Sequence, residues 1–117
     1  MPNRRTLQLA LLLLCVFCAG VSALAETDSP FIVDSWSVRE HLPESAVISV
    51  IQTRDGYLWT GTLNGLARFD GNHFTPFDEN NTPGLNSDRI VFLFEDSHSN
   101  LWVGTETAGL CMIKNER

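Results

Sequence analysis

The apolar and polar positions of this chain follow the same order twice, with a spacing of 43 residues. An apolar run starting at Val47 is followed by Leu58-Trp-Thr-Gly-Thr62, and a second run starting at Ile90 is followed by Leu101-Trp-Val-Gly-Thr105. Each copy then reaches a Gly-Leu step, which comes one residue later in the second copy. Short β-type runs repeated at a period in the low forties are typical of propeller blades. The pattern therefore predicts an all-β fold containing about two blades of a β-propeller.

Twelve repeated positions are predicted to be structural, because a residue that recurs in every blade is suited to packing between blades rather than to one binding site. They are Leu58, Trp59, Gly61, Thr62, Gly65 and Leu66 in the first copy, and Leu101, Trp102, Gly104, Thr105, Gly109 and Leu110 in the second. Stacking of a ligand on Trp59 or Trp102 is the alternative interpretation.

Turn signals divide each copy into strands. Asp55-Gly56 predicts a tight hairpin turn, and Pro76 predicts that its strand lies at a sheet edge. The strands are expected at 47–52, 58–62, 66–69 and 73–77, and then at 89–95, 101–105 and 109–114. The first blade is thus a four-stranded meander and the second lacks a fourth strand. The nearly continuous apolar run 47–52 predicts a strand buried on both faces.

The chain is expected to divide into a signal peptide at 1–25, a linker with an orphan strand at 26–46, a first blade at 47–88 and an incomplete second blade at 89–117. Within the linker, Phe31 to Trp36 predicts a short strand and Val38 to Ser45 a loop. The signal peptide is predicted from a basic start, an apolar stretch from Leu7 and the cleavage motif Ala23-Leu-Ala25. An uncleaved membrane anchor is the alternative, since the apolar stretch is near the ~17 residues that can span a bilayer.

The charge and the cysteine content limit the classes of partner and the covalent cross-links that we expect. Cleavage after Ala25 leaves 14 acidic and 6 basic side chains, a net charge of −8 with neutral histidines. Such acidity argues against nucleic acid and anionic lipid surfaces as partners. Cys111 alone remains, so an internal disulfide is excluded, and a small buried hydrophobic role is favoured over a reactive thiol.

The two copies of Leu-Trp-x-Gly-Thr, each followed by Gly-Leu, resemble the two-component regulator propeller repeat. The first copy is similar to it throughout, from Leu42-Pro through Arg54-Asp-Gly-Tyr-Leu-Trp-Thr-Gly-Thr62 to Gly65-Leu-Ala-Arg-Phe-Asp-Gly71. The second copy departs at Ser97-His-Ser99, where Asp-Gly is expected, and at Leu110-Cys-Met-Ile113.

The resemblance implies the amino-terminal part of a periplasmic sensor region, of the kind found ahead of a membrane helix in hybrid sensor histidine kinases. It implies an extracytoplasmic ligand, a glycan among the candidates, bound at a surface built from the loops of several blades. A kinase transmitter is not recognisable in this sequence, so kinase activity is not carried over. Location is expected to be periplasmic or secreted, or membrane-anchored if the signal is uncleaved.

Catalytic, metal and cofactor motifs are not recognisable. The three histidines are scattered singly, and Asp55-Gly56 and Asp70-Gly71 are accounted for by turns. No serine lies in a nucleophile elbow, and no Gly-rich phosphate loop is present. We therefore expect no enzyme activity, no cofactor and no metal site.

Three accounts of function remain at this point. The first is a truncated segment of a larger sensor, whose partners are further blades of the same or another chain. The second is a small self-assembling secreted binding module. The third is a fragment of a secreted propeller enzyme, which would need catalytic groups that the sequence lacks.

Overall fold

A computed structural model describes residues 3–18 and 30–114, which fall into two compact units, Met1–Val33 and Asp34–Arg117. In the described part of the first unit, residues Arg4–Cys18 form helix α1, which covers much of the predicted apolar stretch. Among the described residues, no helix has the length and apolarity needed to cross a membrane. The predicted cleavage motif Ala23-Leu-Ala25 lies outside the described residues, so the signal peptide stays a prediction.

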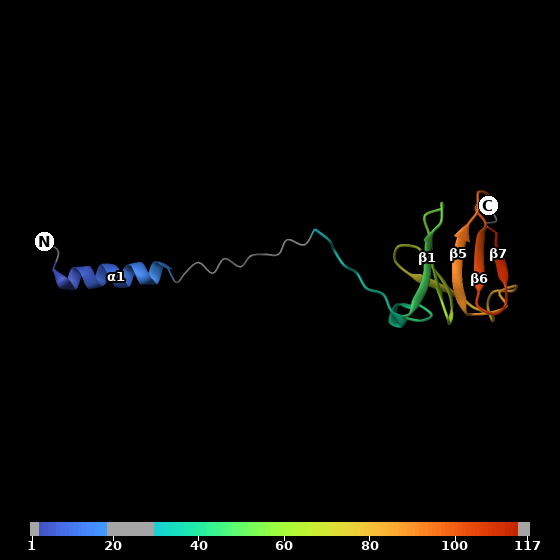
Figure 1. The fold of residues 1–117 in the computed structure, drawn as a ribbon, viewed down its shortest axis with the longest axis horizontal. Coiled ribbons are helices and arrows are strands. Elements are labelled where there is room, and N and C mark those ends of the chain that lie inside the picture. The colour runs from blue at the N-terminus through green and yellow to red at the C-terminus, as the bar shows by residue number, and fades with distance from the viewer. Residues whose placement is uncertain (1–2, 19–29, 115–117) are drawn as a thin grey trace. The chain divides into compact units, whose positions relative to one another are not determined.

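The second unit consists of two antiparallel sheets (Figure 1). The four-stranded sheet contains, in spatial order, β1 (Val47–Gln52), β2 (Leu58–Thr62), β3 (Gly65–Phe69) and β4 (Phe74–Phe77). The three-stranded sheet contains β5 (Ile90–Glu95), β6 (Leu101–Thr105) and β7 (Leu110–Ile113). These are the two propeller-type meanders that the repeat predicts, and all seven strands agree with the expected bounds to within one residue.

Short turns set the register of each meander. The Thr53 amide donates to the Tyr57 carbonyl at 2.9 Å and closes the β1–β2 hairpin around Gly56, whose φ is +93°. The Asp70 carboxylate accepts from the amides of Asn72 and His73 at 2.8 and 2.7 Å, which fixes the turn between β3 and β4. Pro76 lies in β4, which pairs with β3 alone, so the predicted edge position is confirmed.

The strand expected at Phe31 to Trp36 is not formed. Residues 31–37 join neither sheet, and the Ile32 side chain is 94% exposed. A strand is stabilised by the hydrogen bonds and side-chain contacts of a neighbouring strand, and neither sheet includes this segment among its strands. Trp36 instead packs its ring against Phe69, with 5.1 Å between the ring centroids.

The loop expected at Val38 to Ser45 contains one turn of 3₁₀-helix, Val38–Glu40. Ser37 caps this turn, because its hydroxyl accepts from the Arg39 amide while the Glu40 carboxylate accepts from the Ser37 amide. Hydrogen bonds from the Ser37 amide and hydroxyl to the Glu40 carboxylate lower the pKa of Glu40 below its ordinary value. The turn leads into Leu42, which is buried.

The core lies between the two sheets and takes residues from both. Its buried members are Trp59, Leu66, Leu85, Ile90, Leu93, Leu101 and Val103. Strands β1 and β5 lie side by side at this junction (Figure 1). Each sheet contributes one face, because successive side chains along a strand point to opposite faces.

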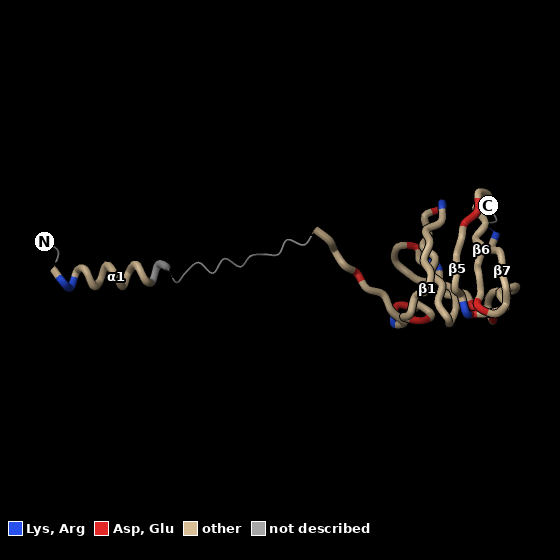
Figure 2. Tube along the Cα trace, viewed as in Figure 1, with Lys and Arg blue, Asp and Glu red and all other residues tan. Residues whose placement is uncertain are grey.

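The prediction that the first strand is buried on both faces is wrong. Val47, Ile48 and Val50 in β1 are 43%, 49% and 62% exposed. The continuous apolar run reflects two apolar faces, of which only one is covered by the second sheet. Figure 2 shows that charged residues lie mainly in loops and at strand ends, so the middles of the strands remain apolar.

Candidate functional site

Gly61 is a point of close approach between the two sheets. A Cβ atom at Gly61 would lie 2.6 Å from Cγ2 of Ile90, a distance that real Cβ contacts do not show. The sequence therefore requires glycine here so that β5 can pack on β2. At the corresponding Gly104, the three atoms nearest to an added Cβ belong to Phe92 and Leu110, both of its own sheet.

The paired tryptophans and leucines occupy opposite environments. Trp59 and Leu66 are buried between the sheets, whereas Trp102 is half-buried and Leu110 is 68% exposed. Leu58 is on the other face and is 37% exposed, while its counterpart Leu101 is buried.

Thr62 and Thr105, which occupy equivalent positions in the two repeats, have the same role. The Thr62 hydroxyl donates to the Gly65 carbonyl and accepts from the Asn64 amide, both within 3.1 Å. The Thr105 hydroxyl donates to the Gly109 carbonyl at 2.8 Å and accepts from the amide of Ala108. In both copies the side chain closes the turn between the second and third strands of the blade.

Hydrogen bonds also join the four-stranded sheet to the second repeat and to the residue pair that leads into β5. The Gly65 amide donates to the Asp88 carbonyl at 2.8 Å, and the Arg54 amide donates to the Glu95 carboxylate at 3.0 Å. The Arg54 guanidinium donates to the carbonyl of Asp96. These contacts fix one sheet relative to the other.

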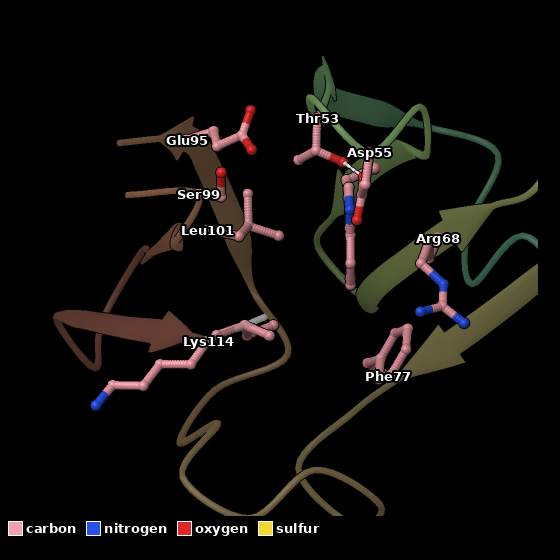
Figure 3. Close-up of a pocket in the computed structure, with 10 residues that line it drawn as sticks. Thr53, Asp55, Arg68, Phe77, Glu95, Ser99, Leu101 and Lys114 are labelled. Carbon is pink, nitrogen blue, oxygen red and sulfur yellow. Dashed lines mark hydrogen bonds between the residues drawn. The ribbon is translucent and has the colours of Figure 1, made fainter. Parts of the chain in front are cut away.

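A small cavity of about 150 Å³ lies between the sheets, and we take it as the candidate binding site (Figure 3). The first repeat contributes Thr53, Asp55, Trp59, Arg68 and Phe77, and the second contributes Glu95, Ser99, Leu101, Ile113 and Lys114. Ligand pockets are usually about 300–1,000 Å³. This cavity therefore accommodates a single ring or one branch of a larger ligand.

Arg68 lies in an aromatic setting at one side of the cavity. Its guanidinium carbon is 4.5 Å from the centroid of the Tyr57 ring, 5.8 Å from that of Trp59 and 5.9 Å from that of Phe77. The rings hold the cation by attraction to their π faces. A guanidinium fixed in this way presents several N–H donors in one plane to a ligand.

Carboxylates supply acceptors around the same cavity. Asp55 accepts from the Thr53 hydroxyl at 2.6 Å, and Thr53 itself is buried. Figure 3 shows Glu95 on the opposite sheet, while Lys114 turns its ammonium group away from the four-stranded sheet. Aromatic faces with acceptors on both sides and one fixed cation can bind a polar ring. They do not form a nucleophile–base pair.

Outside the cavity, the β5–β6 turn contains the most perturbed carboxyl group. Asp96 accepts from the Asn100 side chain, from the indole N–H of Trp102 at 3.0 Å, and from the amides of Asn100 and His98. These hydrogen bonds hold the pKa of Asp96 well below its usual range. The carboxylate therefore organises the turn and orients the half-buried Trp102 ring.

Cys111 lies partly buried in β7 beside the core. Burial raises the pKa of its thiol above the ordinary value, so the thiol stays protonated at neutral pH. Within residues 3–18 and 30–114, no group of three His, Cys, Asp or Glu side chains is arranged to hold a metal ion.

Sequence reasoning named no binding residues, and it did not identify this cavity. The cavity-lining polar residues occupy places where the two copies differ, since Asp55 corresponds to His98, Arg68 to Met112 and Glu95 to Gln52. Positions at which the two copies differ were therefore the sequence signal for the cavity-lining residues, because a residue that serves one binding site need not recur in every blade.

Two antiparallel meanders that repeat at a fixed spacing and pack face to face define this chain as a protein of the β-propeller class. A family model described as two component regulator propeller matches residues 41–64 and 84–107, which are the corresponding parts of the two copies. Each of these two segments is therefore similar to one repeat of that family.

Among curated proteins, the chain is similar to Histidine kinase P4 of Formosa agariphila, with 38% identity over 58 residues. The match covers 50% of this chain and 4% of the relative. The chain thus spans a very small part of the curated relative it matches.

Proposed function

We propose that this chain supplies blades of an extracytoplasmic sensor propeller in a two-component signal transduction system. The observation that carries the proposal is the pair of family repeats, folded as two packed sheets that share one core. The similarity to a protein named as a histidine kinase supports the link to signal transduction. The proposed role is ligand binding and interaction with further blades, with no catalysis and no cofactor in this chain.

Location outside the cytoplasm is supported by the sequence order of the amino-terminus. The apolar helix α1 begins with two arginines, Arg4 and Arg5, and precedes the small-residue motif Ala23-Leu-Ala25. Fusion of alkaline phosphatase, which is active only after export, to the carboxyl end of the chain tests this location. We expect a high reporter activity that falls when Leu12 and Leu13 are both replaced by Arg. An inactive reporter with unchanged expression would contradict export.

The ligand class that we propose for the cavity is a glycan. Sugar rings place C–H groups against aromatic faces and hydroxyls against charged side chains, and the cavity offers Trp59 and Phe77 beside Arg68, Asp55 and Glu95. Its small volume suits one sugar ring of a longer chain. Neutral and acidic oligosaccharides are therefore the probes, with intrinsic tryptophan fluorescence and the melting temperature as readouts.

Arg68→Ala is the informative variant, because it removes the fixed donor group while the surrounding rings remain. We expect binding at least tenfold weaker, which corresponds to about 1.4 kcal/mol. Arg39→Ala, at an exposed arginine of the 3₁₀ turn, is the matched control and leaves binding unchanged. Equal affinities of the two variants would exclude the cavity as the glycan site, and a chain that is exported but binds no saccharide would leave only the sensor location standing.

A further inference from the structure

The two sheets leave two apolar surfaces uncovered on opposite sides of the packed pair. The outer face, as we call it, belongs to the three-stranded sheet and consists of Phe92, Phe94, Trp102, Leu110 and Met112. Four of its members, Phe92, Phe94, Leu110 and Met112, are 56%, 51%, 68% and 36% exposed. Strand alternation places these side chains opposite Leu93 and Val103, which are in the core.

The second surface, the groove face, belongs to the four-stranded sheet. It surrounds a groove of about 260 Å³ lined almost entirely by apolar atoms of Trp36, Leu42, Val47, Val50, Leu58, Thr60, Phe69 and Phe74. Trp36 covers the Phe69 end of the groove, and Val47, Val50 and Leu58 remain 43%, 62% and 37% exposed.

A comparison of equivalent residues in the two repeats indicates which surface each uncovered face can pack against. Shifted by 43 residues, the groove residues Val50, Leu58 and Thr60 correspond to Leu93, Leu101 and Val103, which are buried against the four-stranded sheet. The outer-face residues Trp102 and Leu110 correspond to Trp59 and Leu66, which form the other side of that same contact. The two uncovered surfaces therefore reproduce the two halves of the contact already made inside the chain.

From this correspondence we propose that the outer face of one copy of this chain binds the groove face of a second copy, head to tail. The proposal commits to a second copy, because both halves of the packed interface occur uncovered on the same molecule. It extends beyond ligand sensing and does not depend on the glycan proposal.

The contact between the two sheets inside the chain also predicts which residues touch between two copies. Inside the chain, Ile90 packs onto the bare backbone of Gly61. The equivalent residues are Val47 on the groove face and Gly104 beside the outer face, which likewise presents bare backbone without a side chain. Val47 of one copy therefore packs onto Gly104 of the next.

A backbone hydrogen bond extends the correspondence. The Gly65 amide donates to the Asp88 carbonyl at 2.8 Å across the internal contact. Gly109 and Ser45 are the equivalents of Gly65 and Asp88, so the Gly109 amide of one copy donates to the Ser45 carbonyl of the next. Strands β6 and β7 contain no charged residue, and β5 has only Glu95 at its end, so this docking buries no isolated charge at its centre.

Head-to-tail contacts form rings when the rotation per copy closes. Propellers contain about 4–8 blades, and each copy supplies two sheets. The expected assembly is therefore a closed ring of about two to four copies.

The test uses the full chain, produced in a host that exports it, with the product identified by intact mass. Light scattering coupled to gel filtration measures the mass of wild type and of two face variants. Leu110→Glu blocks the outer face and Val50→Glu blocks the groove face, at side chains that are 68% and 62% exposed. Val38→Glu, at an apolar side chain that is 56% exposed and on neither face, is the matched control.

We expect wild type and Val38→Glu to assemble, and each face variant to be monomeric with an unchanged circular dichroism spectrum. Mixing the two face variants should give a one-to-one dimer, because each retains the face that the other lacks. Met112→Glu repeats the outer-face test at a second position. A monomeric wild type, face variants that stay assembled, or a mixture that stays monomeric would each overturn the proposal.

Discussion

The first and second repeats have corresponding sequences but unequal surroundings. Trp59 is 7% exposed in the core, whereas Trp102 lies half-exposed and donates its indole N–H to Asp96. The side chain nearest to Gly61 is Ile90 of the opposite sheet, whereas the residues nearest to Gly104 are Phe92 and Leu110 of its own sheet. Repeat position therefore determines where a residue lies within its sheet. The presence of a neighbouring sheet determines whether that residue is buried.

The largest expected difference between the repeats is at the tryptophans. Trp59→Ala should lower the free energy of unfolding by about 3–5 kcal/mol, because it empties a site in the shared core. Trp102→Ala should lower it by about 1 kcal/mol, the value of one hydrogen bond. Urea unfolding of both variants, at a concentration where the chain is monomeric, measures the two losses. Equal losses would mean that both tryptophans have the same structural role.

The glycines provide a second contrast. Gly61→Ala should cost about 1–3 kcal/mol, because the new Cβ would overlap Ile90 and separate the sheets. Gly104→Ala should cost less than about 1 kcal/mol, because the nearest atom to an added Cβ there would be Phe92 Cβ of the same sheet, at 3.1 Å, rather than a side chain of the other sheet at 2.6 Å. The same unfolding measurement compares them, and a greater loss for Gly104→Ala would contradict the assigned packing.

The corresponding β-hairpins reach their turns by different means. Gly56 has φ +93°, and the equivalent Ser99 has φ +62°, a left-handed conformation that costs an L-residue about 1–2 kcal/mol. Ser99→Gly should therefore stabilise the chain by about 0.5 kcal/mol, after the entropy cost of glycine is subtracted. Gly56→Ala should destabilise it by about 1 kcal/mol. Midpoints of urea unfolding measure both, and a destabilised Ser99→Gly variant would contradict this account.

The smallest expected effect is the pH dependence of the second hairpin. Because its folded pKa is depressed, the Asp96 carboxylate contributes stability above the unfolded value of ~3.9, and this contribution declines as pH falls towards the folded value. Wild type should therefore exceed Asp96→Asn in stability at neutral pH, and the gap should narrow near pH ~3. Unfolding midpoints at the two pH values measure the gap. A constant gap would show that ionisation of Asp96 is not involved.

The strands were predictable because local signals define them. Asp55-Gly56 and the Asp70 turn separate short apolar runs, and the same spacing occurs twice. The expected strand ending at Trp36 did not form, because strand pairing depends on a neighbour that local sequence does not specify. The burial of Val50 failed as a prediction for the same reason.

The candidate cavity was less accessible to sequence reasoning. It brings Thr53 and Asp55 near Glu95 and Ser99, residues about 40 positions apart that meet only after the two sheets pack. Repetition in the sequence points to what the blades share. A binding site is formed by residues such as Arg68, whose counterpart Met112 is apolar and points outward.

The shared core also has a consequence for the kinetics of folding. The hairpins β1–β2 and β2–β3 close over short loops, which takes microseconds. Burial of Trp59 and Leu66 has to wait until Ile90 and Val103 have left the ribosome. The first sheet therefore exposes apolar side chains while the chain is being synthesised. Packing of the second sheet onto this surface competes with aggregation through the same surface.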